Sequence, residues 1–208
     1  MSEHDFEPIR GLPGDLPAGE HILWQGAPDA WAFARSALNT RWIAGYFAVL
    51  VVWAMVRGTL MGVLLTAGFG AIAIGLALIF ALMVAKTTVY TITNRRVVLR
   101  IGVALSKCIN LPLSQLASAD LRKQAKGFGD IALVPAVRSG LGYALLWPHA
   151  RPMRLSAPQP MLRAIPDAAE VAGVLAKATA AIMPVQQRIS QPAAASVKPV
   201  LGPIGAAA

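Results

Sequence analysis

The residues that could carry acid–base, nucleophilic or metal chemistry are few and lie far apart along the chain. Cys108 is the single cysteine, and the three histidines are scattered. Between residues 30 and 166 the acidic residues are Asp120 and Asp130. General acid–base catalysis needs paired titratable groups, and metal sites need several clustered ligands. We therefore expect no enzyme, no cofactor and no metal site, and we expect Cys108 to be a small buried residue.

Basic side chains form the first candidate site, at Arg95, Arg96, Arg100 and Lys107. Arg95 falls at a predicted hairpin tip. Arg96 and Arg100 have even spacing on one predicted strand, so they face the same side. Such a patch suits anionic lipid or an acidic partner surface, and it equally suits a solvated flank beside a membrane segment. A second basic cluster, within residues 122–126, is interpreted as a solvated turn.

The segment Trp147–Pro152 is the second candidate site, because it combines Trp, His and Arg with two prolines. Prolines stiffen an extended connection and remove backbone donors, while Trp and Arg frequently anchor interfaces. Trp147, His149 and Arg151 are therefore candidates for contact with a partner, and the alternative is a turn that pins two strands. Imidazole can also ligate the metal of a membrane-embedded cofactor, but His149 lies outside any predicted membrane helix, so we do not expect that role.

The distribution of apolar residues predicts the element that carries these sites. The 208-residue chain is 56% hydrophobic and 14% charged, with a net charge of +9, whereas soluble domains average roughly 45–50% apolar and 25% charged. Between Trp42 and Ala85 the one charged residue is Arg57. One helix of that length would measure about 66 Å, twice the thickness of a bilayer core. The sequence predicts a transmembrane helical hairpin over 41–86 that turns at Arg57-Gly58-Thr59; the alternative is a buried hairpin of a soluble protein.

Small residues recur every four positions in the second predicted helix, at Gly62, Thr66 and Gly70. This spacing lets helix backbones approach closely. The stripe is therefore expected to pack the hairpin on itself or to contact another protein; the alternative is that glycine and alanine are simply common in membrane helices.

Basic residues flank both ends of the hairpin, whereas its turn holds Arg57 alone. This asymmetry predicts a multi-pass membrane protein with both termini in the cytoplasm. Residues 1–40 are then a cytoplasmic N-terminal segment. The first residues are acidic and lack a basic region before an early apolar core, so we expect no cleaved signal peptide.

Short β segments follow the hairpin. They are separated by turn residues, which is typical of a small antiparallel sandwich or barrel. A helix then begins at Pro166-Asp167 and ends at Met183-Pro184. The predicted domain covers 87–183, and the Ala/Pro-rich residues 184–208 form a disordered tail. The predicted strands are 88–93, Arg96–Ile101, Ile109–Leu113, Ala119–Arg122, Ile131–Val134, Tyr143–Trp147 and Pro152–Leu155.

Two levels of resemblance are carried by particular motifs. Tyr90–Val98 and Gly127–Ile131 resemble bacterial pleckstrin-homology-like (PH-like) domains that follow membrane hairpins. Leu16–Pro28, Leu145–Pro152 and Pro160–Asp167 resemble the PuhB-type photosynthetic complex assembly proteins of purple bacteria, and this resemblance covers roughly residues 12–180. The expected fold is an α+β membrane protein with a two-helix transmembrane hairpin, an antiparallel β PH-like domain and a C-terminal capping helix.

The PuhB-type resemblance implies a non-enzymatic assembly or scaffolding factor for the reaction centre and core light-harvesting complex, bound to the bacterial inner (intracytoplasmic) membrane. Its partners would be reaction-centre subunits, core antenna or other assembly factors, together with membrane lipids and without nucleic acid; a homo-oligomer stays open. The alternative is a general bacterial PH-like membrane module that binds anionic lipid or an envelope protein. A membrane enzyme is the third hypothesis, and no residue pattern favours it.

Overall fold

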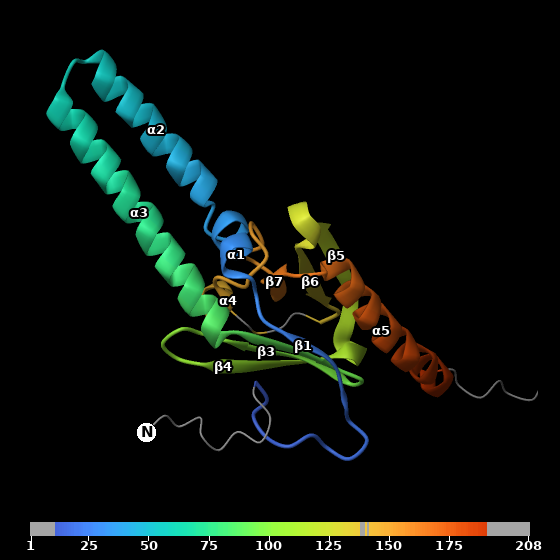
Figure 1. Ribbon diagram of the computed structural model, residues 1–208. Helices are drawn as coiled ribbons and strands as arrows, with labels where there is room; N and C mark the ends of the chain where they lie inside the picture. The colour runs from blue at the N-terminus through green and yellow to red at the C-terminus, as the bar shows by residue number, and fades with distance from the viewer. Residues whose placement is uncertain (1–10, 138–139, 141, 191–208) are drawn as a thin grey trace, which may run out of the picture.

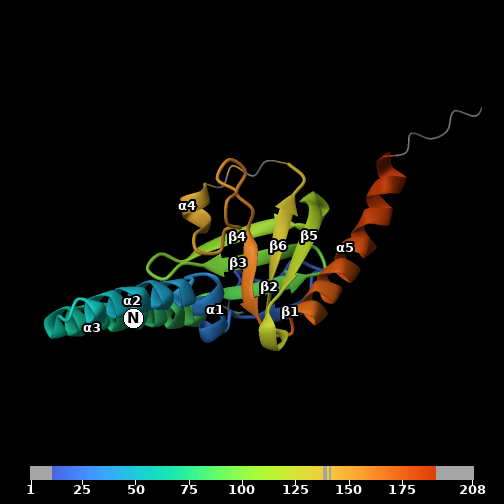
Figure 2. The same cartoon turned by 90° about the horizontal axis from the view of Figure 1, so that it is seen from above.

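The structure, a computed structural model, describes residues 11–137, 140 and 142–190. A helical hairpin projects from a domain built of two antiparallel sheets (Figures 1 and 2). The first sheet has the order β1-β2-β3-β4 and the second the order β5-β6-β7. The strands are β1 Ile22–Gly26, β2 Val89–Thr93, β3 Arg96–Ile101, β4 Lys107–Pro112, β5 Leu116–Lys123, β6 Gly129–Pro135 and β7 Met161–Ile165. The helices are α1 Ala30–Ser36, α2 Thr40–Val56, α3 Leu60–Thr87, α4 Tyr143–Leu146 and α5 Ala168–Ser190.

The five predicted strands between the hairpin and Pro135 are confirmed, and the next two predictions are wrong. Tyr143–Trp147 forms the helical turn α4, in which the Trp147 N–H donates to the Tyr143 carbonyl at 2.9 Å. This turn brings Leu146, which is fully buried, and Tyr143 to one side. Pro152–Leu155 is a turn instead of a strand, because Met153 adopts a left-handed backbone with φ of 62°.

Two strands were not predicted, and one of them changes the division of the chain. β1 pairs antiparallel with β2, with Trp24 opposite Ile92, and β7 pairs with β6. The hairpin is therefore inserted between the first and second strands of one sheet. Residues 22–36 supply a strand and a helix to the β domain, whereas the expected division sets residues 1–40 apart from it.

The main core lies between the two sheets and beneath α5. Tyr90, Leu99, Ile131 and Leu162 are fully buried there together with Leu175 of α5. Every residue of β2 is buried, so the in-and-out alternation that its sequence suggests does not appear. The sheet is covered on both faces at this strand.

The C-terminal helix α5 runs to Ser190, past the end predicted at Met183-Pro184. That predicted end is wrong, since a proline removes one hydrogen bond from a helix without necessarily ending it. Residues 191–208 of the predicted tail lie outside the described residues.

The hairpin helices α2 and α3 pack side by side and turn where the sequence predicts, because α2 ends at Val56 and α3 begins at Leu60 (Figure 1). A Cβ atom on Gly70 would lie 2.9 Å from the Phe47 side chain, and one on Gly62 would lie 3.4 Å from the Ala54 Cβ. The small-residue stripe thus lets α3 approach α2. A Cβ on Gly75, in contrast, would meet nothing within 4 Å.

One helix of the described chain, α3, is by itself long and apolar enough to cross a membrane, with 28 residues and a mean hydropathy of 2.5. This points to membrane association. The 17-residue α2 passes the same test only together with α1, from which it is bent by 61°. The expected helical hairpin is therefore present, but only one of its two helices is by itself a candidate membrane span among the described residues.

The short helix α1 fastens the hairpin to the β domain. Asp29 caps it, since its Oδ1 accepts a hydrogen bond from the Ala32 N–H at 2.8 Å. Phe33 is fully buried and packs in a second core with Val84 of α3 and Ala164 of β7. The base of the hairpin is thus packed against the end of β7.

Candidate interaction site at the base of the hairpin

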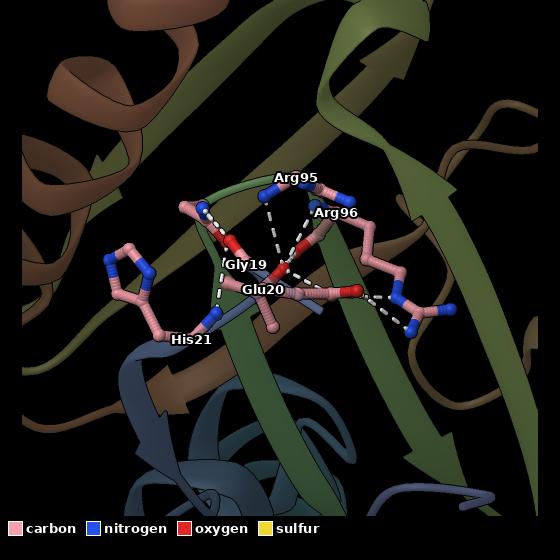
Figure 3. A network of polar contacts seen from close by, with 7 residues as sticks. Gly19, Glu20, His21, Arg95 and Arg96 are labelled. Carbon is pink, nitrogen blue, oxygen red and sulfur yellow. Dashed lines mark hydrogen bonds and ion pairs between the residues drawn. The ribbon is translucent and has the colours of Figure 1, made fainter. Parts of the chain in front are cut away.

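The first candidate patch begins at the turn between β2 and β3, where Arg96 is paired with a buried acid (Figure 3). The Arg96 Nε–H donates to Glu20 Oε1 at 2.8 Å, and its Nη2 donates to Oε2 at 3.1 Å. The Thr93 hydroxyl also donates to Glu20 Oε1 at 2.8 Å. The Glu20 side chain is 2% exposed. The positive charge of Arg96 is therefore neutralised within the fold.

The protonation of Glu20 reflects two opposed effects. Burial raises the pKa of its carboxyl, whereas the hydrogen bonds from Arg96 and Thr93 and the nearby charges of Arg96 and Arg95 lower it, and the net shift is downward. The ionised pair fixes the segment before β1 to the β2–β3 turn. Asn94 adds to this connection, because its amide donates to the Gly19 carbonyl at 3.0 Å.

The four predicted basic residues do not form one surface, and that prediction is wrong. Arg95 and Arg96 lie at one end of β3, whereas Arg100 and Lys107 lie near the other, where Arg100 pairs with Cys108. Arg100 is 8% exposed, and Val98, between the two strand arginines on the same face, is fully buried. The even spacing does put Arg96 and Arg100 on one face, but the fold covers that face.

Cys108 is also placed differently from the prediction. Its side chain is exposed on β4. Across the described residues, no group of three or more His, Cys, Asp or Glu side chains is arranged to hold a metal ion.

The second candidate segment, Trp147–Pro152, is here called the strap and lies at the base of the hairpin. Trp147 stacks on Phe80 of α3 with ring centroids 5.5 Å apart, and it remains 54% exposed. At the other end, Arg151 Nη1 donates to Asp120 Oδ2 of β5 at 2.7 Å and to Gln159 Oε1 at 3.1 Å. The strap therefore connects α3 to the second sheet.

His149, at the middle of the strap, is 1% exposed and bonded at both ring nitrogens. The Tyr90 hydroxyl accepts a hydrogen bond from the Arg163 N–H at 3.2 Å and lies 2.7 Å from His149 Nδ1. His149 Nε2 lies 3.4 Å from Thr88 Oγ1. These contacts join the end of α3 to β2 and β7.

Burial keeps the side chains of His149 and Tyr90 uncharged. Burial and, second, the charge of Arg163 lower the pKa of His149 to about 3. Burial likewise raises the pKa of the Tyr90 hydroxyl far above its usual range. His149 is therefore a neutral, buried residue whose two ring nitrogens both contact side chains of the protein. Its imidazole is not exposed to a partner or a ligand.

Sequence reasoning missed the burial of three charged side chains, those of Glu20, Asp130 and Arg163. Arg163 sits in β7 at 6% exposure. Burial lowers the pKa of its guanidinium, and the Asp130 carboxylate nearby partly restores it. A local sequence pattern could have revealed the burial of Arg163. This residue lies in an apolar run bounded by Pro160 and Pro166, which predicts a buried strand with one charge inside it.

An α+β domain of two antiparallel sheets, a C-terminal helix and an apolar helical hairpin define a bacterial PH-type protein. A model of the bacterial PH domain family (bPH_2) matches residues 40–179, so the chain belongs to that family. It is also 40% identical, over 93% of its length and 96% of the relative's, to a Rhodobacter capsulatus protein described as an uncharacterized 23.7 kDa protein in the puhA 5′ region. No solved structure matches the chain significantly.

Proposed function

We propose that the chain is a membrane-anchored, non-enzymatic factor for assembly of the photosynthetic reaction centre and its core light-harvesting complex. The observation that carries this proposal is the relative of 40% identity, which aligns over nearly the whole of both chains and is named for its position 5′ of puhA, a reaction-centre gene. The resemblance of Leu145–Pro152 and Pro160–Asp167 to PuhB-type assembly proteins supports the same role.

The anchor in this proposal is the α2–α3 hairpin, with both helices in the inner membrane. Because β1 pairs with β2, the chain leaves one folded domain through α1 and returns to it through β2. If α3 crosses the bilayer, α2 must cross it in the other direction. Its 17 residues measure about 26 Å, near the lower limit for a span.

The surface of the hairpin supports this anchor. Large apolar side chains on both helices are exposed, among them Trp42 at 80%, Val56 at 81% and Leu60 at 74%. A continuous apolar surface of this kind is rare in water and normal in lipid. The arginines at its base, Arg35 and Arg41, favour a cytoplasmic location for the β domain and both termini.

The β domain is then the part that contacts nascent subunits or other assembly factors. The packed junction of α1, α3 and the strap would hold this domain next to the bilayer. Such a domain can contact subunits while they insert, and protein–protein contact requires no catalytic group.

Deletion of the gene tests the proposal. In photosynthetically growing cells, the deletion strain is expected to accumulate several-fold less reaction centre and core antenna, measured by their near-infrared absorbance. The gene restored in trans should return both to normal. Normal levels of both complexes in the deletion strain would contradict the assembly role.

A further inference from the structure

A cavity of about 580 Å³ lies at the bend between α1 and α2, facing the end of β5. Among the residues that the structure describes, no aspartate or glutamate lines it. Its basic lining residues come from three separate parts of the sequence and were not predicted to meet. They are Arg35, Arg41, Arg122 and Arg163.

Two buried polar atoms in the lining have no hydrogen-bond partner among the described residues. They are Ser36 Oγ and Gln124 Nε2. Buried polar groups are nearly always paired in proteins, and both of these groups can donate. A bound molecule with several acceptor oxygens would satisfy both of them.

The buried arginine of the cavity also lacks a strong partner. Arg163 is 6% exposed, and its Nε–H donates to the Met161 thioether at 3.4 Å. The nearby Asp130 uses Oδ1 to accept the Ala164 N–H at 2.9 Å. A buried charge is costly unless it is paired, so an anion in the cavity would reduce the cost of burying this guanidinium.

The beginning of α2 adds a further positive field. Asn39 and Arg41 line the cavity at this helix end. The Asn39 side chain makes no capping hydrogen bond, and the first turn of α2 contains no acidic residue. The partial positive charge of a helix N-terminus therefore has no local compensation and favours an anion.

The position of the cavity indicates which class of anion it would bind. α2 begins at its rim and is apolar from Trp42 onward, so the cavity lies at headgroup level if α2 crosses the bilayer. Trp147 also lines the cavity, and tryptophan is frequent at this depth. Guanidinium groups bind phosphate oxygens in paired, planar contacts.

We propose that this cavity binds the phosphate of an anionic phospholipid from the leaflet next to the β domain, with the acyl chains lying along α2. The inference rests on the membrane hairpin of the proposed function. Inorganic phosphate shares the recognised chemistry, and the experiment separates the two sources.

The test uses the full-length protein in non-ionic detergent, titrated with short-chain phosphatidylglycerol, short-chain phosphatidylcholine or inorganic phosphate. Bound lipid is counted by native mass spectrometry, and affinity is followed by the shift in thermal midpoint. The double variant R35Q/R41Q removes two exposed arginines of the cavity and should weaken phosphatidylglycerol binding at least tenfold. The variant R95Q/K107Q removes the same charge from exposed sites outside the cavity and should bind within about twofold of wild type.

R163Q provides an additional test if it folds, and it should lower the affinity further. Equal binding by R35Q/R41Q and R95Q/K107Q would overturn the site. Phosphatidylcholine or inorganic phosphate binding as tightly as phosphatidylglycerol would overturn the lipid assignment. The measurement needs no photosynthetic complex, so its failure leaves the assembly role intact, and a deletion strain with normal complexes leaves the lipid site intact.

Discussion

The two ends of the β domain differ in whether their arginines are paired with an acidic side chain. At the distal end, defined by the β2–β3 turn, Arg96 is held by the buried carboxylate of Glu20. At the proximal end, beside the hairpin, Arg163 and three other arginines surround a cavity without an acidic lining residue in the described chain. Arg96 is thus neutralised by the fold, whereas arginines far apart in sequence gather where α2 begins. We therefore assign the proposed binding of an anion to the proximal end, whereas the ion pair at the distal end stabilises the fold.

The largest effect is expected when the carboxylate of Glu20 at the distal end is removed. E20Q keeps the shape of the side chain but leaves the half-buried guanidinium of Arg96 without its counter-charge, which should cost about 2–3 kcal/mol of unfolding free energy. The thermal midpoint of the full-length protein in detergent measures the loss. D15N removes one exposed negative charge and should change little. If both variants are equally stable, the pairing of Arg96 with Glu20 has no structural role.

The second test concerns the neutral junction at the proximal end. The folded-state pKa of His149 is about 3, against 6.5 for an unperturbed histidine. Below pH 6.5 the unfolded state therefore binds the proton more readily, and stability falls by about 1.4 kcal/mol per pH unit. The loss between pH 6.5 and pH 5 should be about 2 kcal/mol.

The control for this slope is a variant that cannot titrate. H149Q should be less stable at pH 7 and should lose most of the decline between pH 6.5 and pH 5, whereas H21Q, at an exposed position, should keep it. The Glu20 carboxyl contributes little in this window, because its lowered pKa places its own loss of stability at more acidic pH. A slope unchanged in H149Q would contradict a buried neutral imidazole.

A smaller effect is expected where the strap meets the hairpin. W147A removes the stacked contact with Phe80 and should cost about 1 kcal/mol, since aromatic pairs contribute roughly 0.5–1.5 kcal/mol beyond their area. W31A, at a side chain that is 65% exposed, is the matched truncation. Thermal unfolding of the two variants should separate them by a few degrees; equal midpoints would mean that the strap does not hold α3.

The smallest effect is expected at the outer end of the strap. The ion pair between Arg151 and Asp120 is partly exposed on both sides, and such pairs contribute about 0.2–1 kcal/mol in low salt. R151Q should therefore lower stability by about 0.5 kcal/mol, and 1 M salt should remove most of the difference from wild type. A salt-independent loss would indicate that Arg151 acts through packing.

The sequence predicts those parts of the fold in which a pattern is local. The hairpin turn at Arg57 follows from the interruption of an apolar run, and β3 follows from β-branched residues that end at Gly102. A Cβ atom at Gly102 would lie 2.0 Å from the Leu105 carbonyl oxygen, so this turn requires glycine. These features depend on neighbouring residues alone, and they were predicted within a few residues of their positions.

The candidate site could not be predicted in the same way, because it depends on contacts between distant segments. Nothing near Arg96 in sequence shows that Glu20 lies against it, and Arg41 and Arg163 meet only because α1 packs on the end of β7. The sequence makes His149 a candidate for contact with a partner, yet Tyr90 and Thr88 approach it from another part of the chain. Burial of polar groups is a property of the assembled sheets.

The most direct test of the central claim is to capture newly made subunits on the protein during assembly. Photosynthetically growing cells that carry a tagged full-length chain would be pulse-labelled, and the tagged protein would be purified from membranes at successive chase times. We predict that labelled reaction-centre or core-antenna subunits co-purify early and decline as the mature complexes appear. Label that never co-purifies with the tagged protein, or that appears only with the mature complexes, would contradict an assembly role.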